Sequence, residues 1–310
     1  MTTQNRAQVD KFLTQVSNKY MPIGYLSERI LPQINVVQDS GLLAGYGNEH
    51  IRIGTFIHSG SGKYPRVSTQ NRNNQGYVLE KHALSDIITE EDFANVEQPY
   101  DAELDKTDDL TSLLWTEKEI GLADTLGNTS VITNNVTLSG ASQYNDEDNS
   151  NPLADFANAH DTIADLVGMP PNLAVISSKV SRQLKKHPEL LDRLGFKHNK
   201  IGLISDEELA TVLQVEQVLI GETLKNTAKE GQTDVILPIW GKNITFLVSP
   251  RTASKRQISV GYRIQRGNSR RVSKNIPGNP PGAKEIMVDD NYQQLIANAN
   301  AAFLIKDAIA

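Results

Sequence analysis

The sequence predicts an α+β protein in which a compact α/β unit is flanked by elongated segments. Helix-spaced and strand-spaced apolar patterns alternate between residues 152 and 248, whereas the segments on either side are dominated by polar strand and loop patterns. Apolar residues make up only 38% of the 310 residues. That share is below the usual value for a compact globule. We therefore expect long segments that have no core of their own and bury surface on partners.

The first ninety residues predict an arm followed by an extended hairpin. Residues 5–19 have the apolar spacing of a short amphipathic helix, and residues 30–37 form a β-branched segment typical of extended backbone. Strand patterns at 51–53 and 77–79 flank a polar tip around residues 60–63. The edges of a projecting hairpin are unpaired in a monomer, so we expect a neighbouring subunit to cover them.

The longest predicted helix spans about residues 101–126. Three acidic residues between 101 and 105 suit the positive end of a helix dipole, and Gly127 ends the helix. At a rise of about 1.5 Å per residue, its length is roughly 40 Å. The apolar stripe is imperfect, because Glu117 falls where the stripe should continue. A polar loop is predicted at 139–151.

Residues 152–248 carry the patterns of the α/β unit. Helices are predicted at 153–167, from about 180 to 194 with a restart at Pro188, and after the capping-box pair Ser205 and Glu208. Strands are predicted at 173–176 and 215–220, together with a hairpin of 235–237 and 244–248 turned at 241–243. The tail from 257 to 310 is predicted to be strands and loops that end in a buried strand at 301–305.

Charge is unevenly distributed along the chain, although the net charge is only -6. Residues 85–124 carry thirteen acidic residues against two lysines, whereas residues 251–274 carry eight basic residues and no acidic ones. Two solvated faces of one molecule would explain this pattern. Charge complementarity between neighbouring copies would also explain it and would steer an assembly. Dedicated nucleic-acid recognition is disfavoured, because Tyr262 is the only aromatic residue in the basic run.

Motifs for catalysis and cofactor binding are missing from the sequence. Residues 60–64 resemble a phosphate loop but lack its first glycine, and Tyr64 replaces the required Ser or Thr. The six histidines form no His-Glu-x-x-His pair, and the chain has no cysteine. The acidic run at 90–92 could ligate a divalent cation, but a solvated acidic face explains it better. We expect no cofactor and no enzymatic activity, although a Ser/His/Asp triad stays open because its members need not be adjacent.

Membrane insertion and secretion are not expected either. No segment approaches the roughly 18 consecutive apolar residues that a membrane span requires. Residues 1–20 lack the apolar core of a signal peptide. We therefore expect a soluble protein that is made inside a cell and has no membrane partner.

Local sequence patterns support a resemblance to a known family. Thr137–Gly140, Gln143–Asp146 and Asn151–Leu153 follow the long helix in an order that this family carries after its own long helix. Further matching segments are Pro171–Ser177, His187–Pro188, Ile239–Gly241 and Ala302–Asp307. With its order of arm, hairpin, acidic helix, α/β unit and strand-rich tail, the chain resembles the HK97-fold major capsid proteins of tailed phages from about residue 20 to the end.

The resemblance implies an α+β HK97-like capsid fold with five parts. They are an N-terminal arm at 1–44, an extended loop at 45–90, a peripheral domain with a spine helix at 91–152, an axial α/β domain at 153–250 and return strands at 251–310. It also implies that pentamers and hexamers of one chain assemble in the host cytoplasm into an icosahedral shell, the capsid of a virion.

The resemblance further implies several partners. The shell would enclose double-stranded DNA with non-specific contacts, and it would carry a portal and, as in some members, a decoration protein. The chain begins almost at the arm, so we expect a scaffold that is a separate protein or is already cleaved off.

The protein would then function through the free energy of its contacts between subunits. Charged residues of the loop, spine and tail are the candidate contacts. We expect four basic residues of the tail to meet acidic residues 86–109 of an adjacent subunit. These tail residues are Arg263, Arg266, Arg270 and Arg271. The other candidate inter-subunit contacts are Arg52, Lys63, Arg66, Arg72, Glu90, Glu91, Asp92, Asp108 and Asp109. Lys63 is also the one lysine placed for the cross-link that some members form, but no carboxylate partner is evident and we expect no cross-link.

Three other functions stay open. A structural protein of the phage tail or portal would form rings and not closed shells. An encapsulin-like nanocompartment shell would have the same fold and enclose enzymes instead of DNA. A hydrolase built on the α/β unit would be a compact monomer and would leave the arm and the hairpin unexplained. Cargo and oligomeric state distinguish these alternatives.

Overall fold

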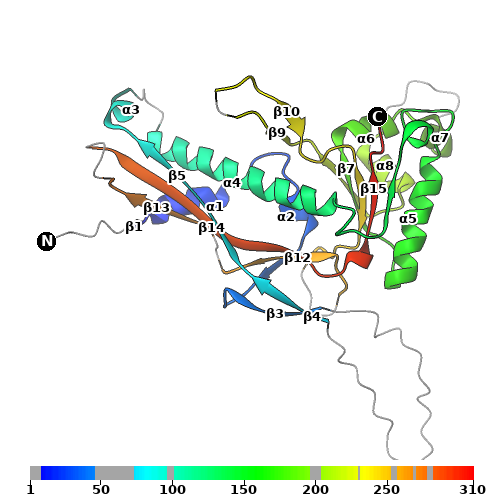
Figure 1. The fold of residues 1–310 in the computed structure, drawn as a ribbon, viewed down its shortest axis with the longest axis horizontal. Helices are drawn as coiled ribbons and strands as arrows, with labels where there is room; N and C mark the ends of the chain where they lie inside the picture. Colours follow the sequence, from blue (N-terminus) through cyan, green and yellow to red (C-terminus); the bar gives the residue numbers. More distant parts are fainter. Residues whose placement is uncertain are drawn as a thin grey trace, which may run out of the picture.

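A computed structural model describes residues 8–45, 73–95, 101–195, 204–229, 231–252, 257–267, 270–277 and 282–310. These residues form an elongated molecule with an α/β end and a long sheet end (Figure 1). The C-terminus lies at the α/β end, and the first described residues lie at the far tip of the sheet end. None of the described helices is long and apolar enough to cross a membrane.

The α/β end is built on a five-stranded sheet with the order β6-β15-β11-β7-β8. Its central strands are β15 (Ala302–Lys306), β11 (Ile244–Leu247) and β7 (Leu173–Ser177), and β11 is antiparallel to both neighbours. The outer strands β6 (Asn135–Thr137) and β8 (Gln217–Gly221) pair in parallel with β15 and β7. The central strands are nearly continuous apolar runs, as expected of strands buried on both faces.

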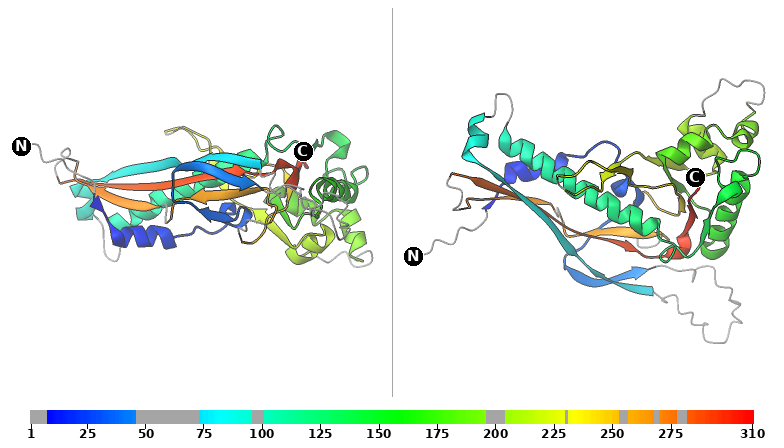
Figure 2. Two further views of the ribbon diagram at one scale, coloured as in Figure 1. Left: turned by 90° about the horizontal axis from the view of Figure 1, so that it is seen from below. Right: turned by 45° about the horizontal axis from the view of Figure 1, so that its top comes forward.

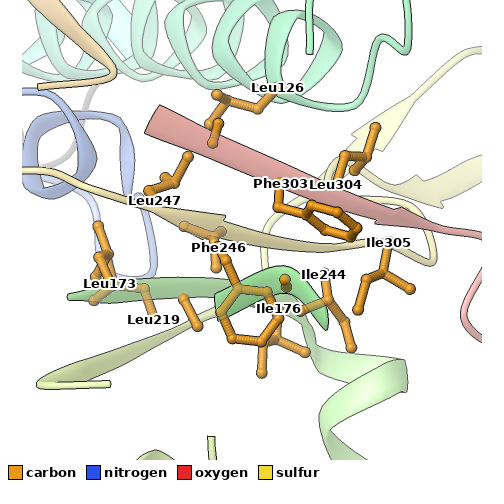
Figure 3. Packing of buried hydrophobic residues seen from close by; sticks show 14 of the residues in the cluster. Leu126, Leu173, Ile176, Leu219, Ile244, Phe246, Leu247, Phe303, Leu304 and Ile305 are labelled. Atoms are coloured by element: carbon orange, nitrogen blue, oxygen red, sulfur yellow. The ribbon is translucent and has the colours of Figure 1, made fainter. Parts of the chain in front are cut away.

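Helices pack around this sheet, and the largest core of the molecule lies between them (Figure 1). The helices are α5 (Pro152–Val167), α6 (Ser178–Leu184), α7 (Pro188–Arg193) and α8 (Asp206–Val212). Figure 3 shows how side chains from four strands and Leu126 of the long helix meet in this core. The predicted restart at Pro188 is confirmed, and so is the reciprocal capping box of Ser205 and Glu208.

The sheet end is built on a six-stranded sheet with the order β1-β13-β14-β12-β2, to which β5 adds along the other edge of β14. β14 (Lys284–Ile296) is antiparallel to β5 (Glu80–Ile88), β13 (Arg271–Asn275) and β12 (Gly261–Gln265). Two short strands from the N-terminal segment, β1 (Gln8–Val9) and β2 (Gln33–Asn35), close the sheet at its edges. Segments far apart in the sequence therefore depend on one another for pairing.

The long helix α4 (Ala102–Leu126) lies along one face of this sheet, and from the opposite side β5 and β14 lie in front of it (Figure 2). The Asp101 carboxylate accepts the N–H of Glu103 at 2.9 Å and so caps the helix start, and Gly127 follows its end. The helix predicted at 101–126 is confirmed. Helices α1 (Lys11–Lys19), α2 (Ser27–Ile30) and α3 (Glu90–Asn95) are shorter, and 3₁₀ turns lie at Gly140–Ser142 and Ala299–Ala301.

Two hairpins leave the body of the molecule. One is formed by β3 (Ser40–Gly45) and β4 (Asn73–Val78). It contains part of the strand predicted at 77–79, whereas the strand predicted at 51–53 lies outside the described residues. The other is formed by β9 (Leu224–Asn226) and β10 (Ile236–Pro238). This second hairpin projects on the α4 side of the molecule (Figure 1). β5, included in the predicted extended loop, is instead a strand of the long sheet.

The hairpin predicted for 235–237 and 244–248 is wrong. β10 pairs with β9, and β11 pairs with β7 and β15. All four residues of β11 are buried, so this strand needs partners on both edges and finds them far away in the sequence. β10 is exposed and takes its partner from the segment that directly follows β8.

Candidate assembly surfaces

A layer of buried charge lies between α4 and the long sheet. The Nζ of Lys118 lies 3.1 Å from Oδ2 of Asp290, and each side chain is 2% exposed. Nη2 of Arg270 lies 3.6 Å from the same oxygen, and its Nη1 donates to the carbonyl of Ser17 at 2.9 Å. One carboxylate therefore faces two cations. Burial lowers the pKa of Lys118, and the Asp290 charge opposes that shift.

Aromatic rings lie against the cations of this layer. The Lys118 ammonium lies 5.0 Å from the ring centre of Trp115 and 4.4 Å from that of Tyr292, and the Arg270 guanidinium lies 5.0 Å from Trp115. His82 of β5 stacks on Tyr292 with ring centres 4.4 Å apart. Cations over aromatic faces gain electrostatic stabilisation when water is excluded. Together the geometry and the charges of these contacts hold α4 in one register against β5 and β14.

A second charged cluster fastens the outer tip of the sheet end. Glu103 pairs with Lys274, and its other oxygen lies 2.6 Å from Nζ of Lys284. Lys274 also lies 2.9 Å from Asp10, whose carboxylate caps the start of α1. Burial acts to raise the pKa of Glu103, but the two lysines hold that pKa below its ordinary value. The hydrogen bond from Lys274 likewise lowers the pKa of Asp10.

Glu119 joins three separate segments at the junction of the two ends. Its carboxylate accepts the backbone N–H groups of Leu26 at 3.0 Å and Ser27 at 2.8 Å, and the indole N–H of Trp240 at 2.8 Å. Burial raises the pKa of Glu119, and these donors oppose the shift. The Trp240 ring packs on Gly221 so closely that a Cβ there would lie 2.2 Å from it. The base of the β9–β10 hairpin is therefore fastened to α4.

Two of the arginines predicted to meet a neighbouring subunit are used inside the subunit. Arg263 pairs with Glu28 and donates to Gln33 at 2.5 Å, and its side chain is 5% exposed. Arg270 belongs to the buried layer between α4 and the sheet. Both residues face inward, so the structure does not support them as contacts between subunits. A count of charges along the sequence could not separate them from their exposed neighbours.

The remaining tail arginines lie on the surface. Arg266 is exposed and lies 3.1 Å from Asp39 of the same chain. Arg271 is exposed on β13 opposite Asp289 of β14. Both stay candidates for inter-subunit contacts.

The acidic candidates divide in a similar way. Glu90, Glu91 and Asp92 are exposed at the start of α3, where Thr89 donates to Asp92 and lowers its pKa. Asp109 is exposed on α4, whereas Asp108 is partly buried, and burial together with neighbouring carboxylates raises its pKa. The structure does not bring these acidic groups onto the tail arginines of the same chain. The loop candidates lie outside the described residues, namely Arg52, Lys63, Arg66 and Arg72.

Catalytic chemistry would require a metal site, or a nucleophile with its base, among the described residues. No group of three His, Asp or Glu side chains in these ranges could hold a metal ion. Ser150 Oγ lies 3.0 Å from Nε2 of His187, a distance at which a nucleophile could meet its base. However, Nδ1 of His187 accepts the N–H of Glu189 at 3.3 Å, so in the neutral ring Nε2 carries the proton. Burial lowers the pKa of His187 and keeps the ring neutral.

This tautomer makes the Ser150–His187 contact structural. The Nε2–H group donates to Ser150, whose hydroxyl donates to the carbonyl of Asp146 at 2.5 Å. A general base would need a free lone pair on Nε2. The pair therefore ties a loop to the start of α7 and gives no support to a hydrolase.

Exposed apolar side chains gather on the projecting parts of the subunit. They lie on α1 and the segments beside it (Val9, Phe12, Met21, Ile23), on and beside the β3–β4 stem (Val37, Leu42, Val78) and on the β9–β10 hairpin (Leu224, Val235, Ile236, Leu237). Exposed apolar clusters of this kind mark surfaces that bind other proteins. The β9–β10 group is not predicted from the sequence, because the sequence pattern pairs residues 235–237 with 244–248.

The chain is similar to two phage proteins along nearly its whole length. It is 25% identical over 312 residues to the major capsid protein of Pseudomonas phage JBD67, with 97% of each chain covered. It is 23% identical over 305 residues to the major capsid protein of Burkholderia phage BcepMu, with 96% of this chain and 95% of that protein covered. No protein-family model matches the chain.

Solved structures with the same fold agree with this result. A phage-related protein from Bordetella bronchiseptica RB50 superimposes with a TM-score of 0.76 at 21% identity and 98% coverage of both chains. The mature capsid of bacteriophage PhiM1 superimposes with a TM-score of 0.55 at 10% identity, covering 99% of this chain and 91% of that one. The chain thus has the HK97-like α+β capsid fold and resembles phage major capsid proteins along nearly its whole length.

Proposed function

We propose that this chain is a major capsid protein whose copies assemble into a closed shell. The observation that carries the proposal is the similarity to a phage major capsid protein over 97% of both chains. The form of the subunit supports it, because most of its exposed large apolar residues lie on projecting hairpins and on the N-terminal segment. Such surfaces gain stability when neighbouring copies bury them, and symmetry repeats each contact around the shell.

The finer parts of the proposal follow the five predicted segments. The segment at 1–44 is the N-terminal arm, the part of the predicted loop at 45–90 that precedes β5 covers a neighbour, and 91–152 holds the spine helix α4. The axial domain at 153–250 surrounds the symmetry axes, and the strands at 251–310 return through both ends. Pentamers and hexamers form an icosahedral virion shell around double-stranded DNA, assembled in the host cytoplasm with a scaffold, a portal and, in some forms, a decoration protein.

The role of the chain in this proposal is structural and not catalytic. Contacts with the packaged DNA are non-specific, because they depend on charge and not on base recognition. The contacts between subunits include charge pairs of Arg266 and Arg271 with acidic residues of a neighbour at 86–109. Loop residues and the acidic surface add further contacts, namely Arg52, Lys63, Arg66, Arg72, Glu90, Glu91, Asp92, Asp108 and Asp109.

Expression of the chain, alone and with the candidate scaffold from the same genome, tests the proposal. Electron microscopy of the high-molecular-weight fraction should show closed polyhedral particles, or rings of five and six subunits that close when the scaffold is added. Double-stranded DNA in particles recovered from a phage infection would support a virion, whereas enclosed enzymes would support a nanocompartment. A uniform population of monomers or dimers under every condition would contradict the proposal.

A further inference from the structure

The β9–β10 hairpin is ordered although little of the subunit covers it. Every residue from 231 to 237 is exposed, and the two strands pair only with each other among the described strands. A two-stranded ribbon of this kind has marginal stability in water unless something else holds it. The contacts that hold this hairpin in shape therefore require an explanation.

Side chains within the hairpin hold its turn. Oδ1 of Asn226 accepts the backbone N–H groups of Ala228 and Val235, both at 3.0 Å, and its Nδ2 donates to Asp234 at 2.8 Å. The N–H of Thr227 donates to the carbonyl of Val235 at 2.9 Å. The turn is thus closed by polar contacts of its own. A segment ordered before it binds loses less conformational entropy on binding.

The base of the hairpin is held just as firmly. The N–H of Ile239 donates to the carbonyl of Thr223 at 3.0 Å, and next to it Trp240 packs on Gly221 and donates to Glu119 of α4. On one face of the hairpin, Nζ of Lys225 lies 4.0 Å from Asp124 near the end of α4. The direction in which the hairpin projects is therefore set by α4.

The opposite face of the hairpin is apolar and open. The register pairs Leu224 with Pro238 and Asn226 with Ile236, so these four residues share one face, and Lys225 and Leu237 lie on the other. The Asn226 side chain is used in hydrogen bonds within the hairpin, so the other three residues make this face mainly apolar. Leu224 is 58% exposed and Ile236 is 61% exposed. We call this face, formed by Leu224, Ile236 and Pro238, the outer strip.

We infer that the outer strip docks on a second copy of this chain during shell assembly. Residues 224–238 contain two lysines, one glutamate and one aspartate, so the hairpin carries no net charge that would attract DNA. An apolar strip on a ribbon with unpaired strand edges fits another protein surface. The inference rests on the proposed function, because the chain resembles proteins named major capsid proteins and a shell surrounds each copy with others.

Two substitutions on the outer strip test the inference. Ile236→Asp and Leu224→Asp each place a charge on an exposed position, so the isolated subunit should keep its wild-type circular dichroism and thermal midpoint. Assembly should be lost, with at least a tenfold smaller fraction of the protein in closed particles by size-exclusion chromatography and electron microscopy. Gln232→Glu is the matched control, since it adds a negative charge to the same hairpin away from the strip, and it should assemble like wild type.

The failures of the two proposals are distinguishable. If wild type forms closed particles and both outer-strip variants do so equally well, the inference is overturned and the shell function stands. If wild type forms no particles under any condition, both proposals are overturned.

Photo-cross-linking in the assembled particle provides an independent measurement. A photoreactive amino acid in place of Ile236 should produce a covalent dimer in which the hairpin peptide is joined to a peptide of a second copy. The same group in place of Gln232 serves as the comparison. Cross-links found only within one chain would overturn the inference, provided that particles form.

Discussion

The two ends of the subunit are stabilised in different ways. The core at the α/β end joins 39 buried apolar residues of the described chain, whereas the core between α4 and the long sheet joins seven. Along α4, the sheet end has the buried charges of Lys118, Arg270 and Asp290 in place of a larger apolar core. Area-dependent hydrophobic stabilisation therefore favours the α/β end.

This difference shows what each end contributes to a shell. Buried ion pairs add little net stability but penalise every arrangement that separates them, so they favour one register of helix and sheet. Most of the exposed large apolar residues lie on the N-terminal segment and the hairpins, and the others are Leu84, Ile87, Leu113, Leu166 and Ile276. We infer that a large apolar core stabilises the α/β end and that neighbouring subunits complete the sheet end.

The largest expected effect is in the α/β core. Phe246 is fully buried, with its ring centre 5.7 Å from that of Phe156 and 5.6 Å from that of His160. Phe246→Ala should lower the free energy of unfolding by about 4 kcal/mol, because it removes a large apolar side chain and leaves a cavity. Urea unfolding of the unassembled subunit, followed by far-ultraviolet circular dichroism, measures the loss. A loss below about 1 kcal/mol would show that this core is not tightly packed.

The next largest effect is expected in the buried charge layer. Asp290→Ala removes the one carboxylate that faces both Lys118 and Arg270, and should lower the free energy of unfolding by about 3 kcal/mol. Replacing all three charges together, as Lys118→Met, Arg270→Met and Asp290→Leu, should restore stability to within about 1 kcal/mol of wild type. The same urea unfolding measures both variants. A triple variant as unstable as Asp290→Ala would mean that the charges themselves stabilise the sheet end.

Acid should loosen the outer tip of the sheet end. The pKa of Glu103 and that of Asp10 are lowered from 4.5 and 3.8 in the folded subunit, so the stabilisation they provide is complete above those values. It is lost as the pH falls through the lower folded pKa of each group. At the α/β end, burial raises the pKa of Asp155 and of Glu189, which opposes acid destabilisation there, whereas burial lowers the pKa of His187, so this end loses stability as the pH falls below 6.5. We expect a loss of about 1 kcal/mol at the sheet end.

The two tryptophans of the chain allow this acid effect to be measured. In a Trp240→Phe variant, Trp115 alone reports on the packing of α4 against the sheet. Its emission should shift to longer wavelength at a higher pH than that at which the far-ultraviolet circular dichroism is lost. The emission of wild type at each pH is the control for damage from the substitution. Simultaneous loss of both signals would contradict a separate acid response of the sheet end.

The smallest effect is expected for a charge pair on the surface. Lys106 lies 2.7 Å from Asp86, but the two side chains are 38% and 44% exposed. Lys106→Ala should therefore change the free energy of unfolding by less than about 0.5 kcal/mol. Set beside Asp290→Ala, this variant separates the effect of burial from that of pairing. A loss as large as that of Asp290→Ala would mean that the exposed pair is as strongly coupled as the buried one.

The helices were predictable from the sequence because their signals are local. The cap at Asp101, the restart at Pro188 and the capping box that begins at Ser205 each act within one turn of backbone. The order of the segments was sufficient to indicate the capsid fold. The pairing of β11 was not predictable in the same way, because its partners β7 and β15 are more than fifty residues away on either side.

The candidate contacts show the limit of a charge pattern. The run at 251–274 contains no acidic residue, yet Arg263 and Arg270 are buried within the subunit while Arg266 and Arg271 are exposed. For Arg263 and Arg271 the direction of the side chain follows from strand register, which depends on long-range pairing with β14. The β9–β10 hairpin was missed for a related reason, since an apolar triplet is compatible with a buried strand and with an exposed one.

Hydrogen exchange measured by mass spectrometry on assembled particles and on unassembled subunits tests most directly whether neighbours complete the sheet end. Peptides from β5 and from the β9–β10 hairpin should exchange more slowly after assembly, whereas peptides from β7 and β11 should be equally protected in both states. Equal protection of β5 and the hairpin in the two states, or a gain confined to β7 and β11, would contradict the account.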